Sequence, residues 1–385
     1  MASSEELDAT VERHLDWSDK QRRILTANDR ADSFYTVERG FAFTAQELPH
    51  YHLLKSTTHA VFDEWKTQTP KNPIVGAWKR PLFYGGWENS TDQDERVYNV
   101  QTHTLFIDLR IPTTKNRLFG AISTSPAQSL QELTAVELRY YARQHCFAGY
   151  SFPSVKTTDD SNNNKPSSLF FDACYARHHC IDWNFCGAGR SRPNKWWVEI
   201  EPTTRNLWKE WAFATDDAAQ QYYCERWERL PGAAADGPVV ALRKSAAAAA
   251  SSGSEVGDGV IVVVGNHFNY CLSRQGVPCQ PPDGTGSLVG LVDAAVENGD
   301  LEAARAWLSM QGGHGTISTG WTIDAAIEFW KEGTALWSKS DVIVQGTSID
   351  DCHVLWKGEL WDVFECNLAT PEDLQALLHV QDDGN

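Results

Sequence analysis

The sequence predicts a mainly β protein with two domains, each a barrel or a sandwich of antiparallel strands. Three observations carry this prediction. Between residues 69 and 232, strand-like segments recur about every ten residues, with turn signals between them. A chain of 385 residues is long enough for two domains. The 16 tryptophans suggest aromatic-lined cavities or barrel interiors, although core packing alone also uses tryptophan.

The clearest strand covers Leu105–Ile111. Its leucines and isoleucines alternate with Phe106, Asp108 and Arg110, and a period of two residues is typical of a half-buried strand. Pro112 follows and has no N–H group to donate. We therefore expect the strand to end there or to lie at an edge of the sheet.

The residues before this strand are expected to pair with one another. The polar turn region 88–95 predicts antiparallel pairing of Trp78–Trp87 with Val97–Ile111. In the second segment, Gln101 and His103 have the opposite parity to the charged residues of the clearest strand. The two sets can then face the same side only if a bulge intervenes.

The rest of the first domain, 69–232, is expected to contain one helix and six further strands. The helix covers Ser129–Gln144, where apolar residues recur at helical spacing. The polar, Asn-rich segment Thr157–Ser168 is typical of a surface loop. The expected strands are Cys146–Phe152, Leu169–Tyr175, His179–Phe185, Lys195–Glu201, Leu207–Thr215 and Gln221–Leu230.

Three segments flank or separate the two domains. Residues 1–68 predict an N-terminal helical extension, in which Ser3 or Ser4 caps an amphipathic helix. Residues 233–259 are rich in Ala, Ser and Gly, which predicts a flexible linker or a long loop. Residues 370–385 predict a short helix followed by an acidic tail.

The second domain, 260–369, opens with a long strand that is broken at Gly265, where we expect a bulge. A helical hairpin follows, with Asp300 as the N-cap of its second helix and Gly312 just beyond the end of that helix. Its two helices are Ser287–Glu297 and Asp300–Met310. The remaining strands are Gly315–Thr322, Ala335–Val344, Cys352–Lys357 and Leu360–Asn367, and the last two are joined by a turn at 357–359.

Charge and cysteine content narrow the classes of function. The formal net charge is −17, and so acidic a chain should repel nucleic acid. No apolar run is long enough to span a bilayer, so we expect no membrane insertion. The nine cysteines are odd in number, and residues 1–15 are polar and acidic rather than a signal peptide. Together these features predict a reduced, cytoplasmic protein.

The motifs that mark nucleotide-dependent enzymes and serine or zinc hydrolases are missing from the sequence, so we expect no cofactor. His178, Cys180 and Cys186 do not have the usual ligand spacing, so we expect no metal site. Instead, His178 held by Asp182 is a candidate acid or base, because the pKa of imidazole is near neutral. The alternative is a histidine satisfied by hydrogen bonds inside a barrel.

Arg110 and Tyr98 are further candidate catalytic donors. Asp108 and Arg110 lie two residues apart, either as an ion pair facing solvent or, on an inward face, as an anchor for a ligand carbonyl or phenol. The candidate ligand-binding residues are aromatic or polar, and core packing would also explain several of them. They are Trp78, Gln101, Phe106, Asp108, Trp183, Tyr223, Trp227, His267 and Tyr270.

Several segments of the chain together resemble a family of bacterial and fungal proteins. The matching segments are Gly76–Arg80, Val97–Gln101 running on to Pro112, Phe147–Gly149, His178 with Ile181–Trp183, and Tyr223–Trp227. Cys146 and Arg177 stand where the family usually has Gly and Trp. The resemblance covers residues 72–232 and, more weakly, 260–340. It implies two lipocalin-like antiparallel β-barrels.

In length and two-barrel build, the chain is also similar to fungal hetero-Diels–Alderases of tropolone–sesquiterpenoid pathways, although no short catalytic motif is shared. This class-level likeness implies a cofactor-free enzyme of secondary metabolism. Such an enzyme would join an apolar terpenoid to an electron-poor, quinone methide-like partner, which His178, Tyr98 or Arg110 would activate. The alternatives are a non-catalytic binder of a hydrophobic small molecule and a protein-interaction module. The sequence leaves the oligomeric state open.

Overall fold

The computed structural model describes residues 72–85, 89–113, 127–154, 173–184, 194–213, 221–233, 236–245, 257–274 and 288–380. The predicted N-terminal extension and the polar loop 157–168 lie outside these residues, as does the end of the acidic tail. The predictions for those segments therefore stay predictions.

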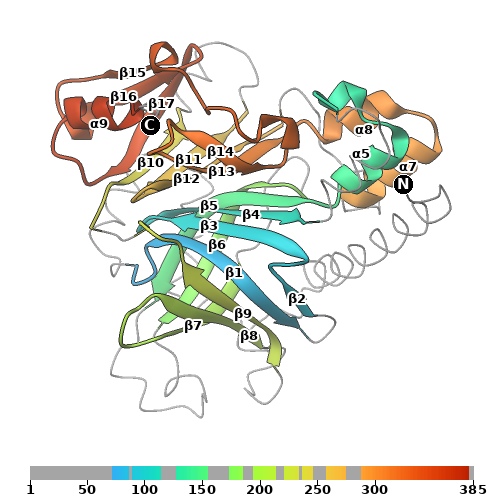
Figure 1. The fold of residues 1–385 in the computed structure, drawn as a ribbon, viewed down its shortest axis with the longest axis horizontal. Helices are drawn as coiled ribbons and strands as arrows, with labels where there is room; N and C mark the ends of the chain where they lie inside the picture. The colour runs from blue at the N-terminus through green and yellow to red at the C-terminus, as the bar shows by residue number, and fades with distance from the viewer. Residues whose placement is uncertain are drawn as a thin grey trace, which may run out of the picture.

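The first sheet has nine antiparallel strands (Figure 1). Its order is β2-β1-β3-β4-β5-β6-β7-β8-β9, and β1 also pairs with β9. The ladder of hydrogen bonds therefore runs from β1 through β3 to β9 and back to β1, which makes the sheet barrel-like. The strands are β1 (Gly76–Gly85), β2 (Asn89–Thr91), β3 (Glu95–Gln101), β4 (Leu105–Pro112), β5 (His145–Ser154), β6 (Ala173–Asp182), β7 (Asn194–Ile200), β8 (Leu207–Phe213) and β9 (Gln221–Arg229).

The second sheet has eight antiparallel strands in the order β14-β13-β12-β11-β10-β17-β16-β15. The prediction of a mainly β protein with two antiparallel sheets is therefore confirmed, while closure of the second sheet into a barrel stays a prediction. The strands are β10 (Val239–Lys244), β11 (Gly259–Val264), β12 (His267–Leu272), β13 (Gln311–Thr316), β14 (Thr322–Ala326), β15 (Val342–Gln345), β16 (His353–Trp356) and β17 (Glu359–Cys366).

The longer described helices are α5 (Ala135–Tyr141), α7 (Leu288–Glu297), α8 (Leu301–Trp307) and α9 (Pro371–Leu378), and the first three lie together beside the two sheets (Figure 1). The single helix predicted over 129–144 is instead a 3-10 turn, η2 (Leu130–Glu132), followed by α5. Thr134 starts α5 with a capping box, and Asp300 caps α8 as predicted. Three more 3-10 turns are η4 (Phe329–Lys331), η5 (Lys339–Asp341) and η6 (Ile349–Asp351).

Three sequence predictions are corrected by the strand pairing. Residues 239–244, expected to belong to the linker, form β10, whose β-branched residues pair with both β11 and β17. Gly265 is not a bulge but the first residue of a two-residue hairpin between β11 and β12, with φ of +59°. Gly312 does not end a helix, since it lies within β13.

Two further predicted strands, 169–175 and 179–185, meet as the single strand β6 over their described part. The intervening Arg177 and His178 continue the extended backbone, because β6 pairs along this stretch with both β5 and β7. The strand that starts at Leu105 does end at Pro112, as the sequence predicts.

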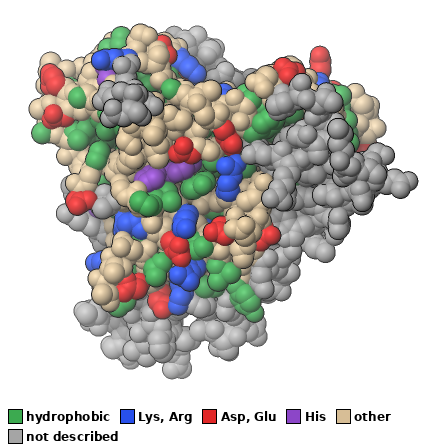
Figure 2. Space-filling view, in the orientation of Figure 1, with side chains coloured by type: hydrophobic (Ala, Val, Ile, Leu, Met, Phe, Trp, Pro, Cys, Tyr) green, Lys and Arg blue, Asp and Glu red, His purple; other side chains and the backbone are tan. Residues whose placement is uncertain are grey.

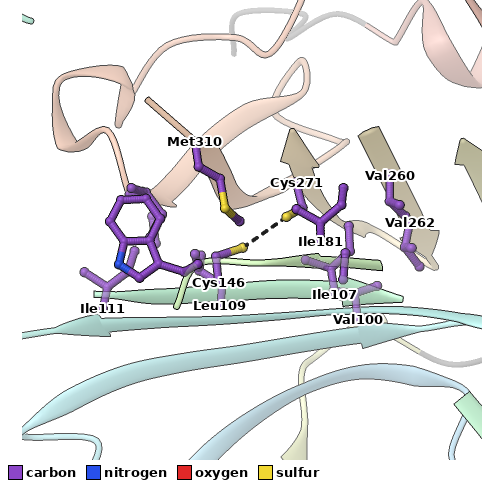
Figure 3. Packing of buried hydrophobic residues seen from close by; sticks show 14 of the residues in the cluster. Val100, Ile107, Leu109, Ile111, Cys146, Ile181, Val260, Val262, Cys271 and Met310 are labelled. Carbon is purple, nitrogen blue, oxygen red and sulfur yellow. Dashed lines mark hydrogen bonds between the residues drawn. The ribbon is translucent and has the colours of Figure 1, made fainter. Parts of the chain in front are cut away.

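The two sheets pack face to face through the largest apolar cluster among the described residues (Figure 3). The first sheet contributes Ile107 and Leu109, and the second contributes Val260 and Val262, all buried. At one end of this contact, Glu365 of β17 accepts hydrogen bonds from the β3–β4 turn, including one from the Thr104 hydroxyl at 2.7 Å. The other faces of the two sheets have separate apolar clusters.

Candidate functional site

The register of β3 against β4 decides which side chains share the inner face of the first sheet, the face that carries Trp78, Asp108 and Trp227. Gln101 lies opposite Phe106, and Asn99 lies opposite Asp108. Directly opposite residues of two paired strands point to the same side. Gln101 therefore faces the same side as Asp108 without a bulge. A turn separates β3 from β4, and the alternation of side chains between the two faces starts anew in β4.

Four buried charged side chains and the partly buried Arg110 form a continuous chain across this inner face. The Arg110 guanidinium contacts Asp108 at 2.7 Å and reaches Glu225 at 3.3 Å. Glu225 in turn lies 2.8 Å from Arg80, and Arg80 lies 2.6 Å from Glu95. Since β9 and β4 are not neighbours in the sheet, the contact of Glu225 with Arg110 ties together strands that the backbone ladder does not pair.

The ion pairing keeps Asp108 and Arg110 charged although both are largely removed from water. Burial alone would raise the pKa of Asp108, but the charge and hydrogen bond of Arg110 outweigh it and lower that pKa below its usual range. Burial likewise lowers the pKa of Arg110, and the carboxylates of Asp108 and Glu225 more than reverse the shift. The predicted pair Asp108–Arg110 is therefore a buried ion pair rather than one that faces solvent.

Arg177 connects the charged residues to the aromatic ones. Its guanidinium carbon lies 4.3 Å from the centre of the Phe106 ring and 4.6 Å from that of Trp196. Its Nη2 donates to Gln101 Oε1 at 3.4 Å, so the amide nitrogen of Gln101 is directed away from this bond. Among the residues that the structure describes, Arg177 Nε, Gln101 Nε2 and Asn99 Oδ1 are buried with no hydrogen-bond partner.

A β-bulge places a second polar group on the same face. Ala148 pairs with Ile181 and Gly149 with His179, so Cys180 is the extra residue of β6. The extra residue shifts the alternation by one, which brings His179 and Asp182 to the same side. His179 Nδ1 lies 2.6 Å from Asp182 Oδ2.

Asp182 is held from several directions. His145 Nε2 lies 3.4 Å from its Oδ1, and the Asn184 backbone N–H donates to the same oxygen at 2.9 Å. Burial alone would raise the pKa of Asp182, but the hydrogen bonds and charges of His145 and His179 hold it well below its usual range. A charged Asp182 orients His179 with Nδ1 toward the carboxylate, as an acid–base pair requires.

Tryptophans and a tyrosine fill another part of the inner face. The Trp208 and Trp227 rings stack with centres 5.3 Å apart, and Trp78 meets Trp208 edge to face at 5.9 Å. Tyr175 stacks on Trp196 at 4.6 Å, and all five rings are buried. The indole N–H groups of Trp208 and Trp227 have no hydrogen-bond partner among the described residues.

The predicted site residues thus fall into separate places. The inner face brings together Trp78, Gln101, Phe106, Asp108, Arg110, Asp182 and Trp227. Trp183 packs between the sheets and donates to the Ala142 carbonyl at 2.9 Å. Tyr270 faces the apolar cluster on the far side of the second sheet. The side chains of His178 and Tyr223 lie outside the described residues, so the predicted pair His178–Asp182 stays a prediction.

Tyr98 of the first sheet and His267 of the second lie where the two sheets meet, each with its ring stacked on His314. Figure 2 shows histidine side chains, in purple, close together near the middle of one face of the molecule. The Tyr98 ring stacks on His314 with centres 4.1 Å apart, and His314 stacks on His267 at 5.4 Å. His314 Nδ1 lies 2.8 Å from Asn269 Oδ1. Burial and, to a smaller degree, the nearby His267 lower the pKa of His314 well below 6.5.

Sequence reasoning missed Arg80, Arg177, His179 and Glu225 as members of the site. Glu225 had a usable signal, because it lies two residues before Trp227 on the same strand and so shares its face. His179 had none, since its alignment with Asp182 depends on the bulge. The partners of Arg80 and Arg177 come from distant strands.

A groove of about 620 Å³ lies elsewhere, between residues 319–341 and the end of α9. None of the predicted site residues lines it. Within the described residues, no helix has both the length and the apolar character needed to cross a bilayer, and no three His, Cys, Asp or Glu side chains are grouped to hold a metal ion.

No family model and no curated protein matches the chain. One solved structure is similar in part, that of the uncharacterized protein YLR301w from the yeast Saccharomyces cerevisiae. It has 12% sequence identity and a TM-score of 0.39, and the match covers 76% of this chain and 99% of the yeast chain.

The ion-pair chain on the inner face predicts a large effect of Glu225→Gln. The substitution leaves Arg80 and Arg110 without their shared carboxylate in a buried site, so we expect a loss of roughly 3 to 5 kcal/mol in the free energy of unfolding. Denaturant titration measures it. The matched control is Glu228→Gln, which removes a half-exposed partner of Lys79 and should cost about 0 to 1 kcal/mol. Equal losses in the two variants would contradict this account of the site.

The buried histidine stack predicts that stability falls in mild acid. In the folded protein His314 binds a proton only well below pH 6.5, whereas in the unfolded chain it does so near pH 6.5. Its contribution is therefore complete above pH 6.5 and is lost as the pH falls below it, by up to about 1.4 kcal/mol per pH unit. His314→Gln should flatten this slope. If the free energies of unfolding of the wild type and of His314→Gln change in parallel between pH 7 and 5, this account of His314 is wrong.

Proposed function

We propose that the inner face of the first sheet binds a small, planar organic molecule, with the ligand stacked among its aromatic rings. One observation carries the proposal: Arg177 Nε, Gln101 Nε2 and Asn99 Oδ1 are buried without a hydrogen-bond partner among the described residues. A buried polar atom left unpaired costs about 1 to 3 kcal/mol, and a ligand that pairs with it recovers this cost.

The chemistry of the unpaired atoms limits the ligand. Arg177 and Gln101 offer donors, which suit a carbonyl or an ionised hydroxyl. Asn99 offers an acceptor, which suits a hydroxyl. Both donors lie beside Phe106, whose ring would support a conjugated system. The ligand class that fits is an aromatic or quinonoid compound with neighbouring hydroxyl and carbonyl groups.

The catalytic form of this proposal is the cofactor-free hetero-Diels–Alder cyclisation. A hydroxylated aromatic precursor loses water to give a quinone methide, which then adds across a double bond of an apolar terpenoid. The pair Asp182–His179 supports it, because an oriented imidazole beside Phe106 and Phe147 can move the proton that water loss requires. Holding both reactants together would lower the barrier further.

Binding is tested with 2-hydroxy-1,4-naphthoquinone as the probe and quenching of tryptophan fluorescence as the signal. We expect saturable quenching, and a loss of about tenfold in affinity in Gln101→Leu because one hydrogen bond is removed. The matched control Gln93→Leu changes an exposed turn and should bind like the wild type. The proposal fails if Gln101→Leu binds with wild-type affinity or if the wild type does not bind.

Catalysis is tested by incubating the protein with an ortho-hydroxybenzyl alcohol and an apolar polyene, followed by liquid chromatography with mass spectrometry. The expected product has the summed mass of the two reactants less one water. His179→Gln should lower its rate of formation by a factor on the order of 100 or more, as for loss of a general acid or base, with probe binding unchanged. Probe binding without any product in the wild type would identify the protein as a binder.

A further inference from the structure

Two cysteines from different sheets meet in the apolar contact between them (Figure 3). Cys146 belongs to β5 and Cys271 to β12, and both are fully buried. The thiol of Cys146 donates to Cys271 Sγ at 3.7 Å, although 125 residues separate the two in the sequence. Both are free thiols.

The second sheet is shaped around the Cys146 thiol. A Cβ atom at Gly312 of β13 would lie 2.7 Å from Cys146 Sγ, so a larger residue there would displace the thiol. The thiol of Cys180 lies in the same apolar contact but donates instead to the Ala148 carbonyl, at 3.4 Å. Among the described cysteines, Cys146 and Cys271 are thus the pair whose sulfur atoms are in contact.

We propose that Cys146 and Cys271 form an oxidation site. A low-molecular-weight disulfide oxidises the pair, and the resulting Cys146–Cys271 disulfide links the two sheets covalently. A disulfide bond is about 2.05 Å long, so the sulfur atoms have to approach by roughly 1.7 Å. One cysteine loses its proton and attacks the small disulfide, which releases one small thiol. The second cysteine then loses its proton and attacks the mixed disulfide, which releases the other small thiol. Two protons and two electrons pass from the protein to the oxidant.

Because the site is buried, we expect the disulfide to form slowly and, once formed, to be reduced slowly. The oxidant reaches the sulfur atoms only when the sheets separate locally, and burial raises the pKa of the Cys271 thiol well above its usual range. The same burial shields the finished disulfide from reductants. The bond also closes a long loop of chain, which reduces the conformational freedom of the unfolded state and so stabilises the folded one.

The test uses the full chain, equilibrated for increasing times in a buffer of oxidised and reduced glutathione at mildly alkaline pH. Free thiols are then blocked, and the protein is digested without reduction for mass spectrometry. We expect a linked peptide that contains Cys146 and Cys271, and an upward shift in the denaturation midpoint of the oxidised protein. The control Cys180→Ala removes the neighbouring thiol and should leave both results unchanged.

Two results would overturn the proposal. One is recovery of Cys146 and Cys271 as blocked thiols from the folded protein, under conditions in which the same buffer oxidises the cysteines of the denatured chain. The other is a linked peptide that joins either cysteine to a different partner. Cys271→Ala supplies a further check, since it removes the proposed partner of Cys146 and the midpoint shift should disappear. Because the wild-type peptides decide the question, the test stands even if this variant folds poorly.

Discussion

Strand β4 is buried on both faces, and the rest of the structure depends on the difference between them. One face, which carries Ile107 and Leu109, joins the apolar contact with the second sheet. The other carries Phe106, Asp108 and Arg110 into the first sheet. A slip of one residue in the register of β4 would place two charges between the sheets, so hydrophobic burial and charge pairing together specify a single register.

The linked charged groups on the inner face are tolerated because each of them has a partner of opposite charge. Removing a carboxylate or a guanidinium from water costs several kcal/mol unless an ion pair and hydrogen bonds compensate for it. Asp108, Glu225 and Glu95 are matched by Arg110 and Arg80, with Arg177 close to Asp108. This local balance contrasts with the net charge of −17 of the whole chain.

The contact between the sheets also joins polar groups that are far apart in the chain. Asn269 of the second sheet donates to the Ile107 carbonyl of the first at 3.0 Å, and its side-chain oxygen lies near His314. Glu365 accepts hydrogen bonds from the β3–β4 turn. Hydrogen bonds are directional and hydrophobic contact is not, so these bonds help to fix the orientation of one sheet relative to the other.

Local patterns in the chain were sufficient to predict the fold class, the end of β4 at Pro112 and the cap at Asp300. Alternation, ring closure in proline and capping act between near neighbours, so single segments carry these signals. The facing of Gln101, the bulge at Cys180 that brings His179 to Asp182, and the meeting of Arg110 with Glu225 could not be predicted in this way. They arise from pairing between strands distant in sequence, where one extra residue in a partner reverses the direction of every side chain that follows.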